Sequence, residues 1–283
     1  MSAPSPLAYR LGAEPTQRLA IFHARGFGVT HAANTSIRDA LDQGAVTTAS
    51  LMLPCPWARE SAALYRGDDV GLMLTMNSEL PLYRWGPVTH APSLVDGNSS
   101  FPRSAPEFWD HADLDEVRRE ARAQLERAVV WGFDITFLDS HLGALLYRPE
   151  FFDVVLDLAI EYSLPISLPG TDHESDAGFP FRSLATEEGV LFPDHRLELS
   201  ASADDDWVAR LLDSLLPGVT EIVLSPARES DELSASDPAR ATARALDDRR
   251  CRQAGVRETL EHADVQLTSY RALRSVQRLA ANS

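Results

Sequence analysis

Short apolar runs alternate with amphipathic stretches along almost the whole chain. Seven runs have the length and residue types of buried strands: Leu19–Phe22, Val46–Leu53, Val70–Met76, Ile135–Leu138, Pro165–Leu168, Thr220–Leu224 and Val265–Thr268. The segments between them have helical spacing: Asn34–Asp42, Trp57–Tyr65, Leu114–Trp131, Pro149–Tyr162, Asp205–Leu215, one or two helices within Ala239–His262, and Tyr270–Ala280. Strand and helix in regular alternation predict a parallel sheet with helical crossovers.

Seven parallel strands in one α/β chain of 283 residues favour a single TIM-like (β/α) barrel, complete or incomplete. The competing open sheet places three spaced glycines after its first strand, and Gly26-Phe27-Gly28 lacks the third. We expect residues 1–17 to be a flexible N-terminal extension and residues 18–283 to form the barrel domain. Irregular segments near residues 77–110 and 170–195 are predicted loop insertions, a common place for lids and binding loops.

Charge and composition narrow the classes of function. The chain has 26 basic and 42 acidic residues, a net charge of −16, and every basic residue is arginine. Without lysine there is no Schiff-base, pyridoxal-phosphate or P-loop lysine. The acidic excess argues against binding to nucleic acid, which relies on basic patches.

Two further patterns concern the compartment of the protein. No stretch is apolar over the ~18 residues that span a bilayer, so we expect no membrane association. The two cysteines, Cys55 and Cys251, have neither metal-binding nor redox spacing, which is typical of a reducing compartment. We therefore expect a cytoplasmic protein.

Barrels of this type carry their active sites at the carboxyl ends of the strands. The residues with useful chemistry at those ends are His23, Arg25, Met73, Thr75, Asp139, His141, Ser225 and Tyr270. Asp139 and His141 lie two positions apart, so both face one side of an extended strand. A carboxylate beside an imidazole can orient it, fix its tautomer or bind a metal with it. An inert hydrogen-bonded pair above the barrel core is the alternative.

A series of motifs occurs in a family-specific order. They are Ile21-Phe22-His23-Ala24-Arg25-Gly26-Phe27-Gly28, then Asn34, Gly44-Ala45-Val46-Thr47-Thr48-Ala49-Ser50-Leu51-Met52, Gly71-Leu72-Met73-Leu74-Thr75, Asp139-Ser140-His141 and Gly218-Val219-Thr220-Glu221-Ile222. Over most of the chain this order resembles the YdjC-like carbohydrate deacetylase family, whose members have a polysaccharide-deacetylase-type (β/α) barrel. In that family, paired aspartates and two histidines hold a divalent metal, and metal-bound water attacks an N-acetyl group on an amino sugar.

This chain departs from the family pattern at most of the positions that bind the metal or take part in catalysis. The paired aspartates are replaced by Arg25 and Gly26, the next histidine by Met73, the second histidine of D-S-H-x-H by Gly143, and H-P-G by Ser225-Pro226-Ala227. His141 is the one family ligand that remains. The guanidinium of Arg25 stands where a family carboxylate binds the divalent cation, so it reverses the sign of the local electric field. The thioether of Met73 is a poor ligand for a hard cation. We therefore expect no metal cofactor.

Three interpretations follow. We favour a diverged barrel that binds a sugar-like or anionic small molecule without family-type hydrolysis. In it Arg25 recognises an anionic group, beside Met73, Thr75, Ser225 and Tyr270; an Arg25–Asp139 pair that only fills the vacated metal position is the simpler alternative.

The second interpretation is an active hydrolase of acetylated carbohydrates whose site is rebuilt around His23, Asp139 and His141, with Mg²⁺ or Zn²⁺ as its cofactor. The third is an interaction subunit, and a homo-oligomer stays open. Aromatic residues of the first insertion, Trp85, Phe101, Phe108 and Trp109, either stack on a sugar or partner or fold their loop onto the barrel.

Overall fold

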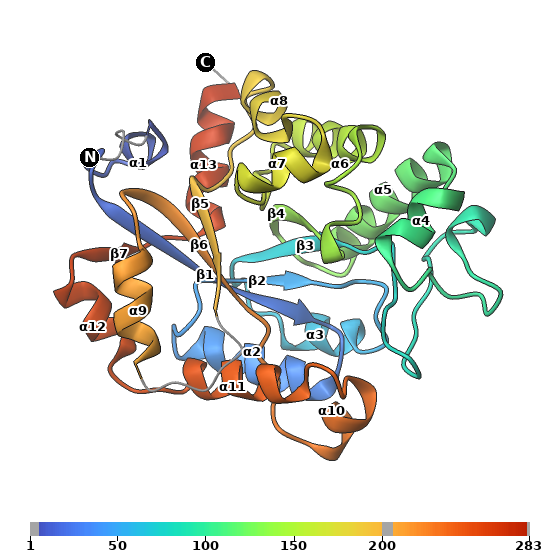
Figure 1. The fold of residues 1–283 in the computed structure, drawn as a ribbon, viewed down its shortest axis with the longest axis horizontal. Coiled ribbons are helices and arrows are strands. Elements are labelled where there is room, and N and C mark those ends of the chain that lie inside the picture. The colour runs from blue at the N-terminus through green and yellow to red at the C-terminus, as the bar shows by residue number, and fades with distance from the viewer. Residues whose placement is uncertain (1–5, 200–205, 282–283) are drawn as a thin grey trace.

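The computed structural model describes residues 6–199 and 206–281. Within these residues one sheet of seven parallel strands has the order β4-β3-β2-β1-β6-β5, and β7 also pairs with β1. The strands are β1 (Arg18–Phe27), β2 (Thr48–Leu51), β3 (Val70–Leu74), β4 (Ile135–Ser140), β5 (His195–Glu198), β6 (Gly218–Leu224) and β7 (Val265–Leu267). The sheet curls into a half-barrel with helices around it (Figure 1), which confirms the predicted TIM-like α/β architecture.

Strand β1 is the axis of the sheet. Its second half pairs with β2, from His23 opposite Thr48, while its first three residues pair with β7. Its other edge pairs with β6 from Arg18 to Ala24. The register with β2 shifts between Arg25 and Phe27, where Gly26 has a φ of 95°. This irregularity lies at the carboxyl end of the sheet, where a barrel carries its site.

The helices surround the sheet, and most of them follow the predicted ranges. They are α1 (Pro6–Arg10), α2 (His31–Asp42), α3 (Ala58–Leu64), α4 (Ala105–His111), α5 (Leu114–Val130), α6 (Pro149–Glu161), α7 (Asp172–Ala177), α8 (Phe181–Glu187), α9 (Trp207–Ser214), α10 (Asp231–Ser236), α11 (Ala241–Cys251), α12 (Val256–His262) and α13 (Tyr270–Ala281), with short 3-10 turns η1 (Pro92–Leu94) and η2 (His141–Gly143). Helix α5 starts where Asp113 accepts hydrogen bonds from the backbone N–H groups of Asp115 and Glu116.

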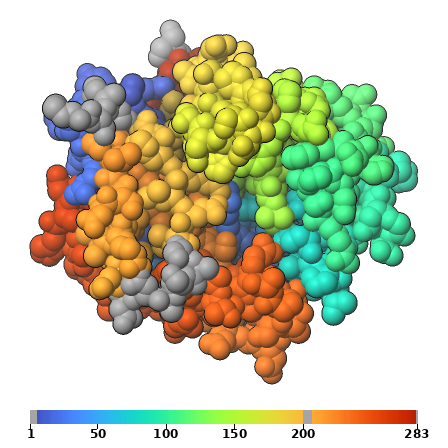
Figure 2. Space-filling view, viewed as in Figure 1, coloured from blue at the N-terminus to red at the C-terminus, as the bar shows by residue number. Residues whose placement is uncertain are grey.

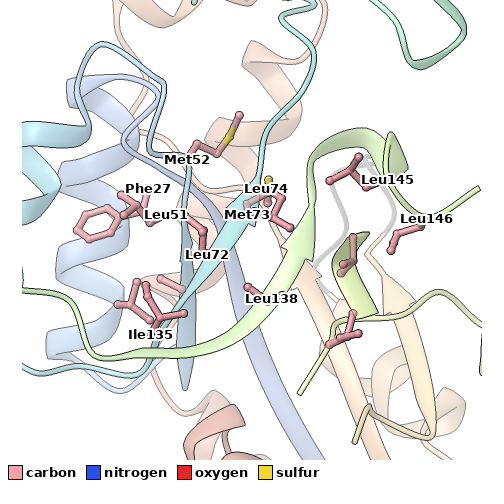
Figure 3. Close-up of a cluster of buried hydrophobic side chains, with 14 of the residues drawn as sticks. Phe27, Leu51, Met52, Leu72, Met73, Leu74, Ile135, Leu138, Leu145 and Leu146 are labelled. Carbon is pink, nitrogen blue, oxygen red and sulfur yellow. The ribbon is translucent and has the colours of Figure 1, made fainter. Parts of the chain in front are cut away.

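The main hydrophobic core lies between the outer face of the sheet and the helices. Phe27, Leu51, Leu72 and Leu74 are fully buried there, and Figure 3 shows them side by side on neighbouring strands. Burying each such side chain contributes about 1.5–3 kcal/mol to folding. The apolar runs of the sequence therefore act as strands because both faces of the sheet are covered.

A second cluster fills the inside of the half-barrel at its amino end. Phe137 and Tyr270 stack there with ring centroids 3.8 Å apart. Leu7 and Ala8 of α1 are buried in the same cluster. Residues 6–10 are therefore packed on the barrel, which corrects the expectation of a flexible extension for that part; residues 1–5 lie outside the described residues.

The predicted strand Pro165–Leu168 is wrong in extent. Only Ile166 forms a bridge there, opposite Leu138. The strand β5 lies instead at His195–Glu198, where the sequence shows no apolar run, because this edge strand is partly exposed along its length. The second insertion before it contains helices α7 and α8. The predicted start of α9 at Asp205 lies outside the described residues.

The first insertion folds back onto the barrel. Arg84 donates hydrogen bonds to Ser78, Asp96 and the carbonyl of Phe101, over distances of 3.2, 2.9 and 2.6 Å. Trp85 and Phe101 are buried, and the indole N–H of Trp85 donates to the carbonyl of Asn77. In the described part of the chain, no helix has the length and apolar character to span a membrane.

Candidate functional site

A cavity of about 110 Å³ opens at the carboxyl ends of the strands. Four residues expected from the sequence line it: Arg25, Met73, His141 and Ser225. Figure 2 shows that the open side of the half-barrel is hollowed, with the blue chain of the N-terminal strand at the floor of the hollow. The parallel topology explains this convergence, because strands β1, β3, β4 and β6 all end on this side.

Arg25, which lines the cavity, forms an ion pair with Asp139. Nη2 of Arg25 donates to Oδ1 of Asp139 over 2.6 Å, and the Asp139 side chain is fully buried while that of Arg25 is 17% exposed. Oδ1 also accepts from the backbone N–H of Ser140. Two buried atoms beside this bond, Nε of Arg25 and Oδ2 of Asp139, have no hydrogen-bond partner among the described residues. The pair therefore leaves one buried donor and one buried acceptor without a hydrogen bond.

The cavity lining also contains Glu79, which the sequence did not single out. Nε2 of His141 donates to Oε2 of Glu79 over 2.8 Å, and Arg240 donates to Oε1 of the same carboxylate. Burial alone would raise the pKa of Glu79, but the charges and hydrogen bonds of His141 and Arg240 outweigh it and hold the pKa well below its ordinary value. Glu79 is therefore a carboxylate at neutral pH.

Two arginines from the C-terminal part of the chain, Arg240 and Arg244, also line the cavity. Arg240 precedes α11 and Arg244 lies one helical turn later, so both contact Asp237, at 3.1 and 3.4 Å. Nε of Arg244 also donates to the carbonyl of Ser225. The four-residue spacing was visible in the sequence. The role of the two arginines in the cavity was not predicted, because they lie at and on a helix and not at the end of a strand.

His23 belongs to a separate, fully buried contact. Its Nδ1 donates to Glu221 over 2.7 Å, and the hydroxyl of Ser167 donates to the same carboxylate. Burial raises the pKa of Glu221, but the hydrogen bond and charge of His23, with Arg196 and Arg25 further off, bring it down to about 2. His23 is not part of the cavity lining, so the structure separates it from His141.

Two other expected pocket residues also lie away from the cavity. Thr75 is fully buried, and its hydroxyl donates to the carbonyl of Met73 over 2.8 Å. Tyr270 is buried at the start of α13, where it stacks on Phe137. This corrects the expectation that Thr75 and Tyr270 face the ligand. Both residues form part of the packing of the barrel.

The divalent metal that the family resemblance implies does not fit the residues present. A Cβ atom on Gly26 would lie 3.0 Å from Nη2 of Arg244, and one on Gly143 would lie 2.3 Å from the ring of Tyr147. Arg244 therefore crowds position 26, and Tyr147, four residues along the chain, occupies the space that a side chain at position 143 would need. Within the described residues, no three His, Cys, Asp or Glu side chains are grouped so that they could hold a metal ion. The guanidinium of Arg25, which is ion-paired with Asp139, also repels a divalent cation.

Comparison with known proteins finds relatives that are carbohydrate deacetylases. A carbohydrate deacetylase of Thermus thermophilus is 38% identical over 158 residues, which cover 54% of this chain and 56% of that protein. A carbohydrate deacetylase of Thermoanaerobacter pseudethanolicus is 29% identical over 223 residues, which cover 75% of this chain and 82% of that protein. The stronger match thus spans only about half the length of its relative.

Solved structures share the fold. A crystal structure from Enterococcus faecalis, described as a candidate cellobiose-phosphate cleavage protein, has a TM-score of 0.76 at 24% identity, over 91% of this chain and 99% of that one. The family model for YdjC-like proteins matches residues 19–268, which include every strand of the half-barrel except the first residue of β1. With its motifs, its curled parallel sheet and this match, the chain belongs to the YdjC-like protein family.

Proposed function

We propose that the cavity binds a sugar-like or anionic small molecule, and that this chain does not perform metal-dependent hydrolysis. The contact between Arg25 and Asp139 carries the second part of this proposal, and it is the pair expected in the alternative in which Arg25 only fills the vacated metal position. It puts a permanent cation beside the carboxylate that precedes the retained family histidine. Arg244 over Gly26 and Tyr147 over Gly143 support it, because each fills space that a family ligand would need.

The lining of the cavity has the chemistry for such a ligand. Guanidinium groups of Arg25, Arg240 and Arg244 supply hydrogen-bond donors suited to carboxylate, phosphate or hydroxyl oxygens. Trp85 and Met73 supply apolar surface against which a sugar ring can pack. A few polar groups on an apolar wall are typical of small-molecule sites. The carbohydrate deacetylases among the relatives make a carbohydrate the first class to test.

Metal analysis of the purified full chain tests the proposed absence of metal-dependent hydrolysis. We expect less than stoichiometric Zn²⁺ and Mg²⁺ by mass spectrometry after dialysis against either ion. We also expect the chelator EDTA to leave the melting temperature unchanged. Stoichiometric metal that disappears in His141→Ala would contradict the proposal.

Calorimetric titration tests the proposed ligand binding. Glucose, N-acetylglucosamine, glucose 6-phosphate and glucuronate separate neutral from anionic sugars. We expect at least one to bind, with a loss of about tenfold or more in Arg25→Gln, since a charged hydrogen bond is worth roughly 1.5–3 kcal/mol. Arg66→Gln is the matched control, because its side chain is 66% exposed and is not part of the cavity lining. Equal losses of affinity in the two variants would show that the ligand does not bind in this cavity.

A second candidate function, hydrolysis of acetylated carbohydrates, is favoured by the contact of His141 with Glu79. An imidazole that a carboxylate orients is a common general acid or base, and His141 lines the cavity. His23 and Asp139, expected as its partners, lie in other contacts. Release of acetate from N-acetylglucosamine derivatives, measured for the wild type and His141→Ala, decides between the two functions. Release that depends on His141 would establish the hydrolase.

We also propose that the protein is cytoplasmic, on the basis of its cysteine usage. That it forms a homo-oligomer stays a prediction. Both cysteines are free and buried, as expected of thiols kept reduced. Cell fractionation and light scattering of the purified chain test the two statements. Recovery in the secreted fraction would exclude the first, and a strictly monomeric mass would exclude the second.

A further inference from the structure

On the basis of the binding function proposed above, we propose that His141 and Arg240 form an anion-binding subsite, and that the carboxylate of Glu79 occupies it in the unliganded chain. A carboxylate or phosphate group of the ligand takes the place of Glu79 when it binds. Glu79 is then an internal competitor for the ligand. Its side chain leaves the two donors free when it turns outward.

The hydrogen bonds of Glu79 have the form of a bound anion. One carboxylate oxygen accepts from Nε2 of His141 over 2.8 Å, and the other accepts from the guanidinium of Arg240. His141 comes from the end of β4 and Arg240 from the start of α11, so the two donors converge from distant parts of the chain. A ligand carboxylate or phosphate offers two oxygens in the same way.

The charges around the cavity explain why an anion is needed there. Asp139 is matched by Arg25, and Asp237 by Arg240 and Arg244. Both aspartates are at most 3% exposed and lie outside the cavity lining. Among the described residues that line the cavity, Glu79 is the only acidic one beside three arginines. Withdrawal of Glu79 therefore leaves a positive excess that an anionic ligand neutralises.

Glu79 is also the acidic group that can leave. Its side chain is 20% exposed, and it lies in the irregular segment after β3. The backbone next to it is held in place, because the N–H of Ser78 donates to the carbonyl of Pro102 and the N–H of Trp85 donates to the hydroxyl of Ser78. The proposed movement is therefore a rotation of the Glu79 side chain.

The small volume of the cavity is consistent with a ligand site that the Glu79 side chain partly fills. Its volume of about 110 Å³ is well below the ~300–1,000 Å³ of ordinary ligand pockets. It still exceeds the ~15 Å³ that one water molecule needs, so it has room for a small anionic group. Outward rotation of Glu79 joins its own volume to the cavity.

Calorimetric titration of the full chain with inorganic phosphate, at constant ionic strength, tests this subsite. We expect Glu79→Gln and Glu79→Ala to bind phosphate about tenfold more tightly than the wild type. Adding Arg240→Gln to Glu79→Ala is expected to reverse the gain. Glu229→Gln is the matched control, because it removes one negative charge from a side chain that is 83% exposed. Thermal unfolding of each variant verifies that it is folded.

Glucose 6-phosphate and glucuronate then distinguish a phosphate from a carboxylate ligand, with glucose as the neutral reference. A gain for either anion in Glu79→Ala, without a gain for glucose, supports the subsite. Phosphate affinity that is unchanged or weaker in both Glu79 variants overturns it, as does a gain of equal size in Glu229→Gln. Failure of all sugars to bind, with the phosphate gain intact, refutes the sugar-binding part of the proposed function and leaves the anion subsite standing.

Discussion

Arg25 on β1 reaches across the half-barrel to Asp139 on β4, with Nη2 and Oδ1 2.6 Å apart, although β2 and β3 separate the two strands in the sheet. The curl of the sheet brings these strand ends together. A flat sheet with strands ~4.8 Å apart would hold them too far from each other for one side chain to bridge. The ion pair is therefore a consequence of barrel curvature, and it fixes the cation of the site above a buried carboxylate.

Removal of Arg25 is expected to destabilise the fold strongly. Arg25→Ala leaves the Asp139 carboxylate buried without its cation, which costs about 3–5 kcal/mol in the free energy of unfolding. Urea unfolding at neutral pH measures this. The double variant Arg25→Met/Asp139→Leu is expected to recover most of the loss, since no buried charge remains. A loss no larger than that of Arg66→Ala, an exposed arginine, would show that Asp139 does not depend on Arg25.

Reintroduction of the family histidine at position 143 is expected to fail. The backbone of Gly143 has a φ of 69°, and any Cβ there would lie 2.3 Å from the ring of Tyr147. Gly143→His should therefore lower the free energy of unfolding by about 2–4 kcal/mol, from strain and overpacking together. Thermal unfolding measures it. Adding Tyr147→Ala should restore the part of the free energy of unfolding that is lost to overpacking and leave the part that is lost to backbone strain. If no stability is restored, contact with Tyr147 is not the cause of the loss.

Stability in acid is expected to depend on Glu221. Its pKa in the folded chain is about 2, against 4.5 for an ordinary glutamate, so the folded state binds this proton less readily than the unfolded state. The stabilisation is therefore complete above pH 4.5 and is lost as the pH falls from there towards 2. It amounts to on the order of a few kcal/mol for a shift of this size.

Urea unfolding over this pH range measures the effect of Glu221→Gln. We expect a less stable protein at pH 7 and a smaller further loss between pH 4.5 and 2 than in the wild type. Glu161→Gln is the control, because Glu161 pairs with Arg122 at the surface, where both side chains are more than 40% exposed. A curve for Glu221→Gln that runs parallel to the wild type would contradict the role of this carboxyl.

Both thiols are expected to be unreactive in the folded chain. Burial is the main cause that raises the pKa of Cys251 to about 12 and that of Cys55 well above its ordinary value. Ellman's reagent at pH 8 should label neither thiol without denaturant and both in guanidinium chloride. Rapid labelling of the native chain, with Cys55→Ser and Cys251→Ser to identify the thiol, would show that one of them is accessible.

Much of the fold was predictable from local patterns. Apolar runs such as Val70–Met76 coincide with strands because a strand covered on both faces needs apolar residues throughout. The helix at Leu114–Trp131 was clear because its apolar residues recur at helical spacing behind the cap Asp113. The strand at His195–Glu198 was missed because an edge strand that stays partly exposed has no such run.

The sequence by itself determined the alternation of strands and helices, the family, and the group formed by Arg25, Met73, His141 and Ser225. Parallel strands end on the same side of a sheet, so residues that follow them meet without further information. Only the tertiary structure decided that Glu79, Arg240 and Arg244 join this group and that His23, Thr75 and Tyr270 do not. Those positions depend on how a loop and a helix from distant parts of the chain pack, and local residue patterns do not encode long-range packing.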